Sequence, residues 1–133
     1  MVTVASGLIS WSAKKQVCIA LSTTEVEYVA MTRALQECIW LKSNFQQLSI
    51  ASPSSISIKS DNEGAIALAD NGISHNHIKH IDIRFHFIRS HINSKTFLLS
   101  HISGTENPAD IFTKSLPHPI FEFHHTNLGL LAR

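Results

Sequence analysis

A long run of residues with helical apolar spacing, from Thr23 to about Phe45, constrains the fold of this chain more than any other feature. Its apolar members recur every three or four positions and share one side of a helix: Val26, Ala30, Ala34, Cys38, Leu41 and Phe45. Ser22 and Thr23 are both acceptable N-caps. The pattern predicts a long helix that packs on the rest of the molecule through this stripe.

The remaining segments alternate between strand-like and helical patterns. Strands are predicted as a pair at 2–13 and 16–21 and singly at 56–60 and 96–102, and helices at 62–70, 77–92, 107–115 and 118–130. Strands first, followed by alternating strands and helices, predict an α/β fold in which helices pack on a mixed β-sheet. A chain of 133 residues without repeats or a linker is expected to form a single domain, 1–133.

Charge and cysteine usage narrow the class of protein. Eleven Lys and Arg residues against ten Asp and Glu residues give a formal charge of +1, so any contact with a polyanion must be local. Cys18 and Cys38 fit neither a disulfide framework nor a zinc cluster, which favours a reducing, intracellular setting. Because neither a basic leader nor a stretch of about 18 apolar residues occurs, we expect a soluble protein without a membrane partner.

Glu27 is the first acidic residue that lies in an unusual position for a charged side chain. It projects within the apolar stripe of the 23–45 helix, whereas Glu25 points to the other side. A carboxylate directed into an apolar interface is unfavourable unless a cation or hydrogen bonds receive it. The alternative is a first-turn glutamate that interacts with the helix dipole and bends out to water.

Asp61 follows directly on the strand predicted at 56–60 and precedes a helix. It therefore lies at the carboxyl end of a strand, where α/β proteins tend to gather ligand-binding side chains. The alternative reading is an N-cap for the helix at 62–70.

Asp110 lies near the start of the helix predicted at 107–115, with Asn107 as its N-cap and Pro108 at its first position. The buried stripe of that helix is expected to consist of Ala109, Phe112 and Leu116, and Asp110 lies well off it. The alternative is an ordinary first-turn aspartate. Glu27, Asp61 and Asp110 together form a set of carboxylates that suits hard cations such as Mg²⁺ and the cleavage of phosphodiesters.

Five segments, in this order, carry a resemblance to a known family: LISWSAKKQ, LSTTEVEYVAM, SDNEGAIALA, KHIDIRFHFIR and NPADIFTKSLP. From about Gly7 to Leu130 the chain resembles the ribonuclease H domain at the carboxyl end of the polyprotein of copia-type long-terminal-repeat retrotransposons, particularly those of plants. The resemblance implies a ribonuclease H-like mixed β-sheet flanked by α-helices. It implies Mg²⁺- or Mn²⁺-dependent hydrolysis of the RNA strand of RNA–DNA hybrids, with the reverse transcriptase portion of the same polyprotein as a further partner.

The resemblance also assigns roles to residues. The second acid of TEVEY carries over to Glu27, the aspartate of SDN to Asp61 and that of NPAD to Asp110, as catalytic residues and metal ligands. The family has a further aspartate on a first strand ahead of the ISW segment, and this sequence has no Asp or Glu before Glu25. We therefore expect an N-terminally truncated fold with weak or no cleavage by this chain alone. The alternative function is a non-catalytic retroelement fragment or a pseudo-enzyme that binds nucleic acid weakly.

The histidines do not change this interpretation. His75, His77 and His80 lie close together, but neither an H-E-x-x-H motif nor a cysteine pair accompanies them, which argues against structural zinc. His101, the histidine nearest ahead of Asp110, belongs to the strand predicted at 96–102, and no catalytic role is assigned to it.

Overall fold

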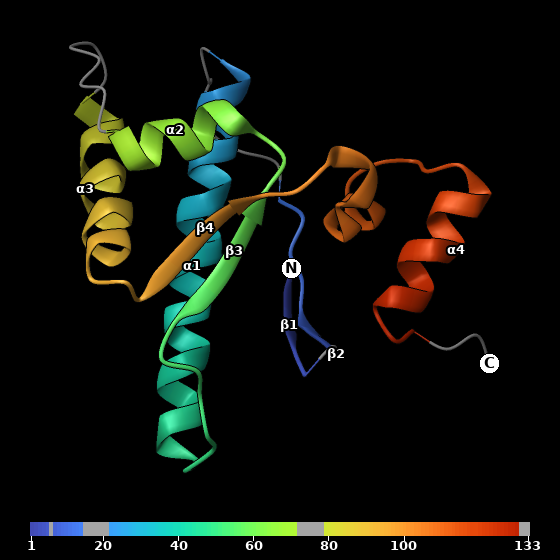
Figure 1. Ribbon diagram of the computed structural model, residues 1–133, viewed down its shortest axis with the longest axis horizontal. Coiled ribbons are helices and arrows are strands. Elements are labelled where there is room, and N and C mark those ends of the chain that lie inside the picture. The colour runs from blue at the N-terminus through green and yellow to red at the C-terminus, as the bar shows by residue number, and fades with distance from the viewer. Residues whose placement is uncertain (6, 15–21, 72–78, 131–133) are drawn as a thin grey trace. The chain divides into compact units, whose positions relative to one another are not determined.

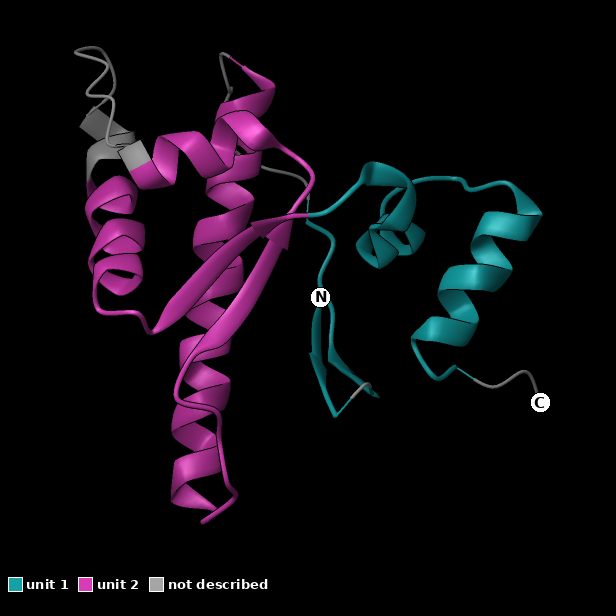
Figure 2. Cartoon of the chain, viewed as in Figure 1, with its two compact units in different colours: residues 1–18, 102–133 teal, residues 19–101 magenta. Residues whose placement is uncertain are grey.

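The computed structural model of the chain describes residues 1–5, 7–14, 22–71 and 79–130. It consists of two compact units, coloured separately in Figure 2. Unit 1 comprises residues 1–18 and 102–133, and unit 2 comprises residues 19–101. Two-stranded sheets, α-helices and short 3-10 helices are distributed between the two units, so the chain is of the mixed α/β class.

Unit 2 contains three of the helices and one pair of strands (Figure 1). In chain order these are α1 (Thr23–Gln47), β3 (Ile56–Ser60), α2 (Glu63–Asn71), α3 (Lys79–Asn93) and β4 (Phe97–His101). β3 and β4 pair in parallel, with Ile56 opposite Phe97 and Ser60 opposite His101. The connection between parallel strands needs a crossover, which α2 and α3 supply.

The core of unit 2 lies where the helices contact one another and the strand pair. Tyr28 and Leu35 of α1, Ile88 of α3 and Phe97 of β4 are its largest fully buried apolar side chains. Tyr28 stacks on Phe85 of α3, with the ring centroids 6.3 Å apart. Tyr28 and Leu35 lie two turns apart, so α1 faces the core along its buried side.

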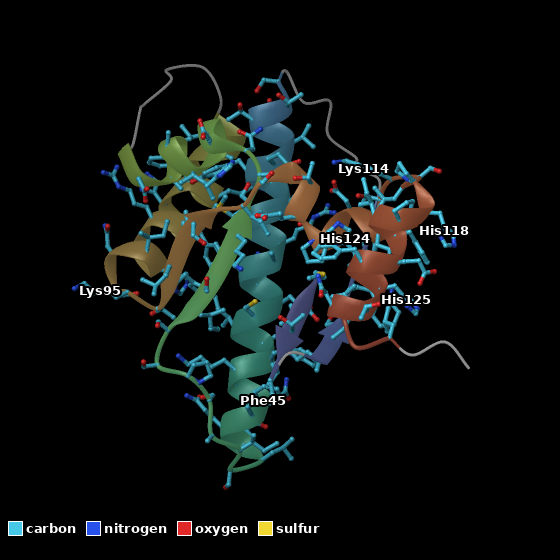
Figure 3. All side chains as sticks on the ribbon, turned by 45° about the vertical axis from the view of Figure 1, so that its right-hand side comes forward. Phe45, Lys95, Lys114, His118, His124 and His125 are labelled. Carbon is cyan, nitrogen blue, oxygen red and sulfur yellow. The ribbon has the colours of Figure 1, made fainter. Side chains whose placement is uncertain are left out.

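Unit 1 contains the two ends of the chain. Its strands β1 (Val2–Val4) and β2 (Gly7–Ser10) form an antiparallel hairpin. Its carboxyl-terminal part consists of the 3-10 helices η1 (Gly104–Glu106) and η2 (Pro108–Phe112), followed by α4 (His118–Asn127), which contacts η2. His124 of α4, labelled in Figure 3, and Leu128, which directly follows α4, are buried.

Most of the predicted elements after Ser22 are confirmed. The helix from Thr23, the strand at 56–60 and the helix that follows it have nearly the predicted bounds, and the strand at 96–102 and the last helix are also present. Residues 79–93 of the helix predicted from 77 are helical as well. The second strand of the predicted pair, at 16–21, lies outside the described residues.

Two predictions about elements were wrong. Residues 2–13 do not form one strand, because Ala5 adopts a positive φ of 49° and turns the chain back on itself, so β1 and β2 are a hairpin. The helix predicted at 107–115 is a 3-10 helix that ends at Phe112. In addition, the described strands form two separate pairs rather than one mixed sheet.

Candidate carboxylate site

Glu27 lies in the second turn of α1, and the buried face of that helix differs from the predicted stripe. The buried residues are Tyr28, Val29, Met31, Thr32, Leu35 and Cys38, whereas Val26 and Ala30 are exposed. The predicted stripe was therefore wrong for its first two members, because Tyr28 rather than Val26 enters the core. Glu27 is half-buried and flanks the buried face between Met31 and Ala34.

The start of α1 is defined by Ser22. Its hydroxyl accepts a hydrogen bond from the backbone N–H of Glu25 at 3.1 Å, which is the N-cap interaction expected for serine. Glu25 lies in the first turn and is half-buried. The cap fixes where the helix begins and thereby fixes Glu27 one residue into its second turn.

Asp61 directly follows the carboxyl end of β3, as predicted, and is half-buried. The cap of α2 is the neighbouring residue, because Asn62 Oδ1 accepts a hydrogen bond of 2.9 Å from the backbone N–H of Ala65. The backbone N–H of Asn62 in turn donates to Ser60 Oγ at 3.2 Å. The alternative that Asp61 caps this helix is therefore wrong, and its carboxylate is not engaged in capping.

The turn that bears Asp61 approaches the first turns of α1. A methyl group added to Gly64 would lie 3.0 Å from Thr24 Oγ1 and 3.1 Å from Asn62 Oδ1. The first turn of α2 thus lies directly against the first turn of α1, and Figure 1 shows β3 running toward this crossing. Within unit 2, Glu27 and Asp61 come from neighbouring ends of two elements.

Asp110 is buried, which its predicted position off the apolar stripe did not suggest. It is the buried residue of η2, with 13% of its side chain exposed, whereas Ala109, Phe112 and Leu116 are half-buried. The 3-10 geometry places side chains differently from the α-helix that was assumed. The predicted cap is confirmed, since Asn107 Oδ1 accepts from the backbone N–H of Ala109 at 3.2 Å.

The Asp110 carboxylate already receives a positive charge. Lys114 Nζ lies 2.7 Å from Asp110 Oδ2 and forms both a hydrogen bond and a salt bridge with it. The ammonium group of Lys114 is itself a monovalent cation, so the position next to Asp110 accommodates positive charge. Carboxylate oxygens are also the ligands that Mg²⁺ and Mn²⁺ prefer, and the residue types of the set fit such an ion.

The set of acids is divided between the units. Glu27 and Asp61 belong to unit 2, and Asp110 belongs to unit 1. In the described part of either unit, no three His, Cys, Asp or Glu residues gather into a group that could hold a metal ion. A site built from all three carboxylates is consequently a proposal.

Three histidines and two further polar residues can also be compared with what the sequence predicts. His101 is the last residue of β4 and is exposed, and His75 and His77 lie outside the described residues. Sequence reasoning missed the roles of Asn62 and Lys114. The four-residue spacing of Asp110 and Lys114 was a readable signal, because side chains at that spacing meet on a helical turn.

The described residues form a mixed α/β structure with two small sheets and four α-helices, and similarity to known proteins narrows the class of protein further. The chain is 41% identical over 128 residues to the retrovirus-related Pol polyprotein from transposon TNT 1-94 of Nicotiana tabacum. That alignment covers 96% of this chain and 10% of the tobacco protein. It is 35% identical over 122 residues to the polyprotein from transposon RE1 of Arabidopsis thaliana and 34% identical over 123 residues to that from RE2. Each alignment covers 92% of this chain and 8% of the relative.

These relatives are Pol polyproteins of plant transposons, and the similarity supports a retroelement-derived protein. The chain spans about a tenth or less of the length of the curated relatives it matches. No family model matches the chain. No solved structure matches it significantly. None of the helices in the described residues is long and apolar enough to cross a membrane.

Proposed function

We propose that this chain contributes Glu27, Asp61 and Asp110 to a divalent-cation site that hydrolyses the RNA strand of RNA–DNA hybrids, as in ribonucleases H. The observation that carries the proposal is the contact between the first turns of α1 and α2 at Thr24 and Gly64, because it brings the segments that bear Glu27 and Asp61 to one end of unit 2. The assignment of Asp110 to the same site comes from the resemblance of its NPAD motif to that of the family. The choice of an RNA–DNA hybrid as the substrate comes from the family resemblance that the five ordered sequence segments carry.

The chemistry follows from the donor set. The carboxylates of Glu27, Asp61 and Asp110 would hold Mg²⁺ or Mn²⁺, which when bound activates water and stabilises the leaving oxygen of a phosphodiester. Asp61 is suited to this role because Asn62 does the capping of α2. Asp110 is suited because its carboxylate is shielded from water and already attracts a cation.

Cleavage of a labelled RNA–DNA hybrid tests the proposal. The chain is assayed alone and fused behind the residues that precede the matched segment in the tobacco polyprotein, with Mg²⁺ or Mn²⁺. We expect weak or no cleavage by the chain alone and metal-dependent cleavage of the RNA strand by the fusion. Glu27→Gln, Asp61→Asn and Asp110→Asn should each reduce the rate by about 100-fold or more, since loss of even an outer-shell partner costs about 10–100-fold. Glu25→Gln is the matched control and should retain the rate.

Full activity of the Glu27→Gln fusion, or the absence of cleavage by an intact fusion that binds hybrid, would refute the proposed nuclease. Salt-sensitive binding of the hybrid without cleavage would instead favour a nucleic-acid-binding module. Neither binding nor cleavage would favour an inert retroelement fragment. The near-zero net charge makes any such binding dependent on a local patch rather than on the whole surface.

A further inference from the structure

Lys114 and Asp110 form a short polar contact in unit 1. Lys114 Nζ lies 2.7 Å from Asp110 Oδ2, a distance typical of a charge-assisted hydrogen bond. The backbone reinforces the contact, because the N–H groups of Thr113 and Lys114 donate to the Asp110 carbonyl at 3.0 and 2.9 Å. The end of η2 therefore holds the ammonium group next to the carboxylate.

The two partners differ in their exposure to water. The Asp110 side chain is 13% exposed and the Lys114 side chain 56% exposed. A carboxylate shielded to this degree requires a counter-charge, and leaving it unpaired is unfavourable. Water can reach the more exposed lysine, so its ammonium group can be hydrated when it is not paired with Asp110.

We propose that Lys114 is the resident counter-ion of Asp110 in the metal-free protein and that it competes with the divalent cation for this carboxylate. This inference rests on the proposed function, since it assigns the cation to Asp110. A lysine and a divalent ion on one carboxylate repel each other, so Lys114 lowers the affinity for the cation. Lys114 acts through Asp110 and is a positioning residue that sets metal affinity.

Binding of Mn²⁺, followed by the electron paramagnetic resonance signal of the free ion, tests the competition in the fusion protein described above. We expect Lys114→Met and Lys114→Gln to bind Mn²⁺ about two- to fivefold more tightly, the range that corresponds to an ion pair with one exposed partner. Lys114→Arg should bind as the unsubstituted protein does. Lys14→Met, at an exposed lysine of the same unit, is the control and should leave the affinity unchanged.

Thermal unfolding without metal tests the counter-ion role separately. Lys114→Met should lower the Tm, because it leaves a shielded carboxylate unpaired. Addition of Asp110→Asn should recover most of that loss, and circular dichroism reports whether each variant is folded. An additive effect of the two substitutions would overturn the counter-ion role.

The two proposals fail in different ways. Unchanged or weaker Mn²⁺ binding by both Lys114→Met and Lys114→Gln, with binding lost in Asp110→Asn, would overturn the competition and leave the proposed function intact. Mn²⁺ binding that is equally tight in Asp110→Asn and in the unsubstituted protein would overturn the assignment of the cation to Asp110, and both proposals with it.

Discussion

Tyr28 is the residue whose environment the structure defines most sharply. It is 1% exposed and stacks on Phe85, whose ring also carries the guanidinium of Arg89 at 5.5 Å. Its hydroxyl is buried and has no hydrogen-bond partner among the described residues. Burial raises the pKa of Tyr28 to about 12, although the charge of Arg89 lowers it in part.

The pKa of Tyr28 can be measured without interference, because it is the only tyrosine in the chain. Since the folded state favours the protonated phenol, its contribution to stability is complete below pH 10 and is lost as the pH rises from 10 to about 12. We expect the ultraviolet absorbance of tyrosinate to appear near pH 12 in the folded protein and near pH 10 in urea. Titration near pH 10 in both conditions would contradict the burial of Tyr28.

Cys38 and Asp110 show what residue-level reasoning could reach. Cys38 was predicted to be buried, and it is, with burial raising the pKa of its thiol. Asp110 was predicted to lie off the buried stripe, and it is buried. The difference is physical, because Cys38 follows from helical periodicity alone, whereas the burial of Asp110 depends on a 3-10 turn and on the packing around it.

At the scale of elements, capping separates Asn62 from its neighbour Asp61. Asn62→Ala removes the hydrogen bond to Ala65 N–H, and the free energy of unfolding should fall by about 1 kcal/mol. Asp61→Ala should change it by about 0.5 kcal/mol or less, because Asp61 does not cap α2. Urea denaturation measures both values. A larger loss in Asp61→Ala than in Asn62→Ala would contradict the assignment of the cap.

The packing face of α1 gives a second comparison between matched positions. Leu35 is completely buried and Trp40 is 61% exposed, although both lie in the middle of the same helix. Leu35→Ala should lower the free energy of unfolding by about 2–5 kcal/mol. Trp40→Ala should change it by less than about 1 kcal/mol. If the two effects measured by urea denaturation were equal, α1 would pack through a different face.

The success of prediction for an element depended on how local its signals are. β3 was predictable because alternation in ISIKS marks a half-buried strand, and α1 because Ser22 supplies its cap. The hairpin of β1 and β2 was not, since its turn places Ala5 at a positive φ, which alanine rarely adopts. The face of α1 was misjudged because Tyr28 packs against α3, a contact that helical spacing within α1 does not contain.

At the scale of the whole molecule, the mixed α/β class was predictable and the arrangement of the sheet was not. Alternating patterns set the class, but strand pairing is a long-range property. The described strands pair within their own units, β1 with β2 and β3 with β4. The candidate site has the same character, because each acid can be identified locally, whereas the proposed sharing of one cation would depend on tertiary structure.

The central claim is that Glu27, Asp61 and Asp110 share a cation, and anomalous X-ray diffraction from crystals of the protein with Mn²⁺ tests it most directly. We predict a manganese peak with a carboxyl oxygen of each of the three residues about 2.1 Å away or linked to it through one water. Carboxyl groups of these residues that face different regions, with no manganese ion in common, would contradict the account.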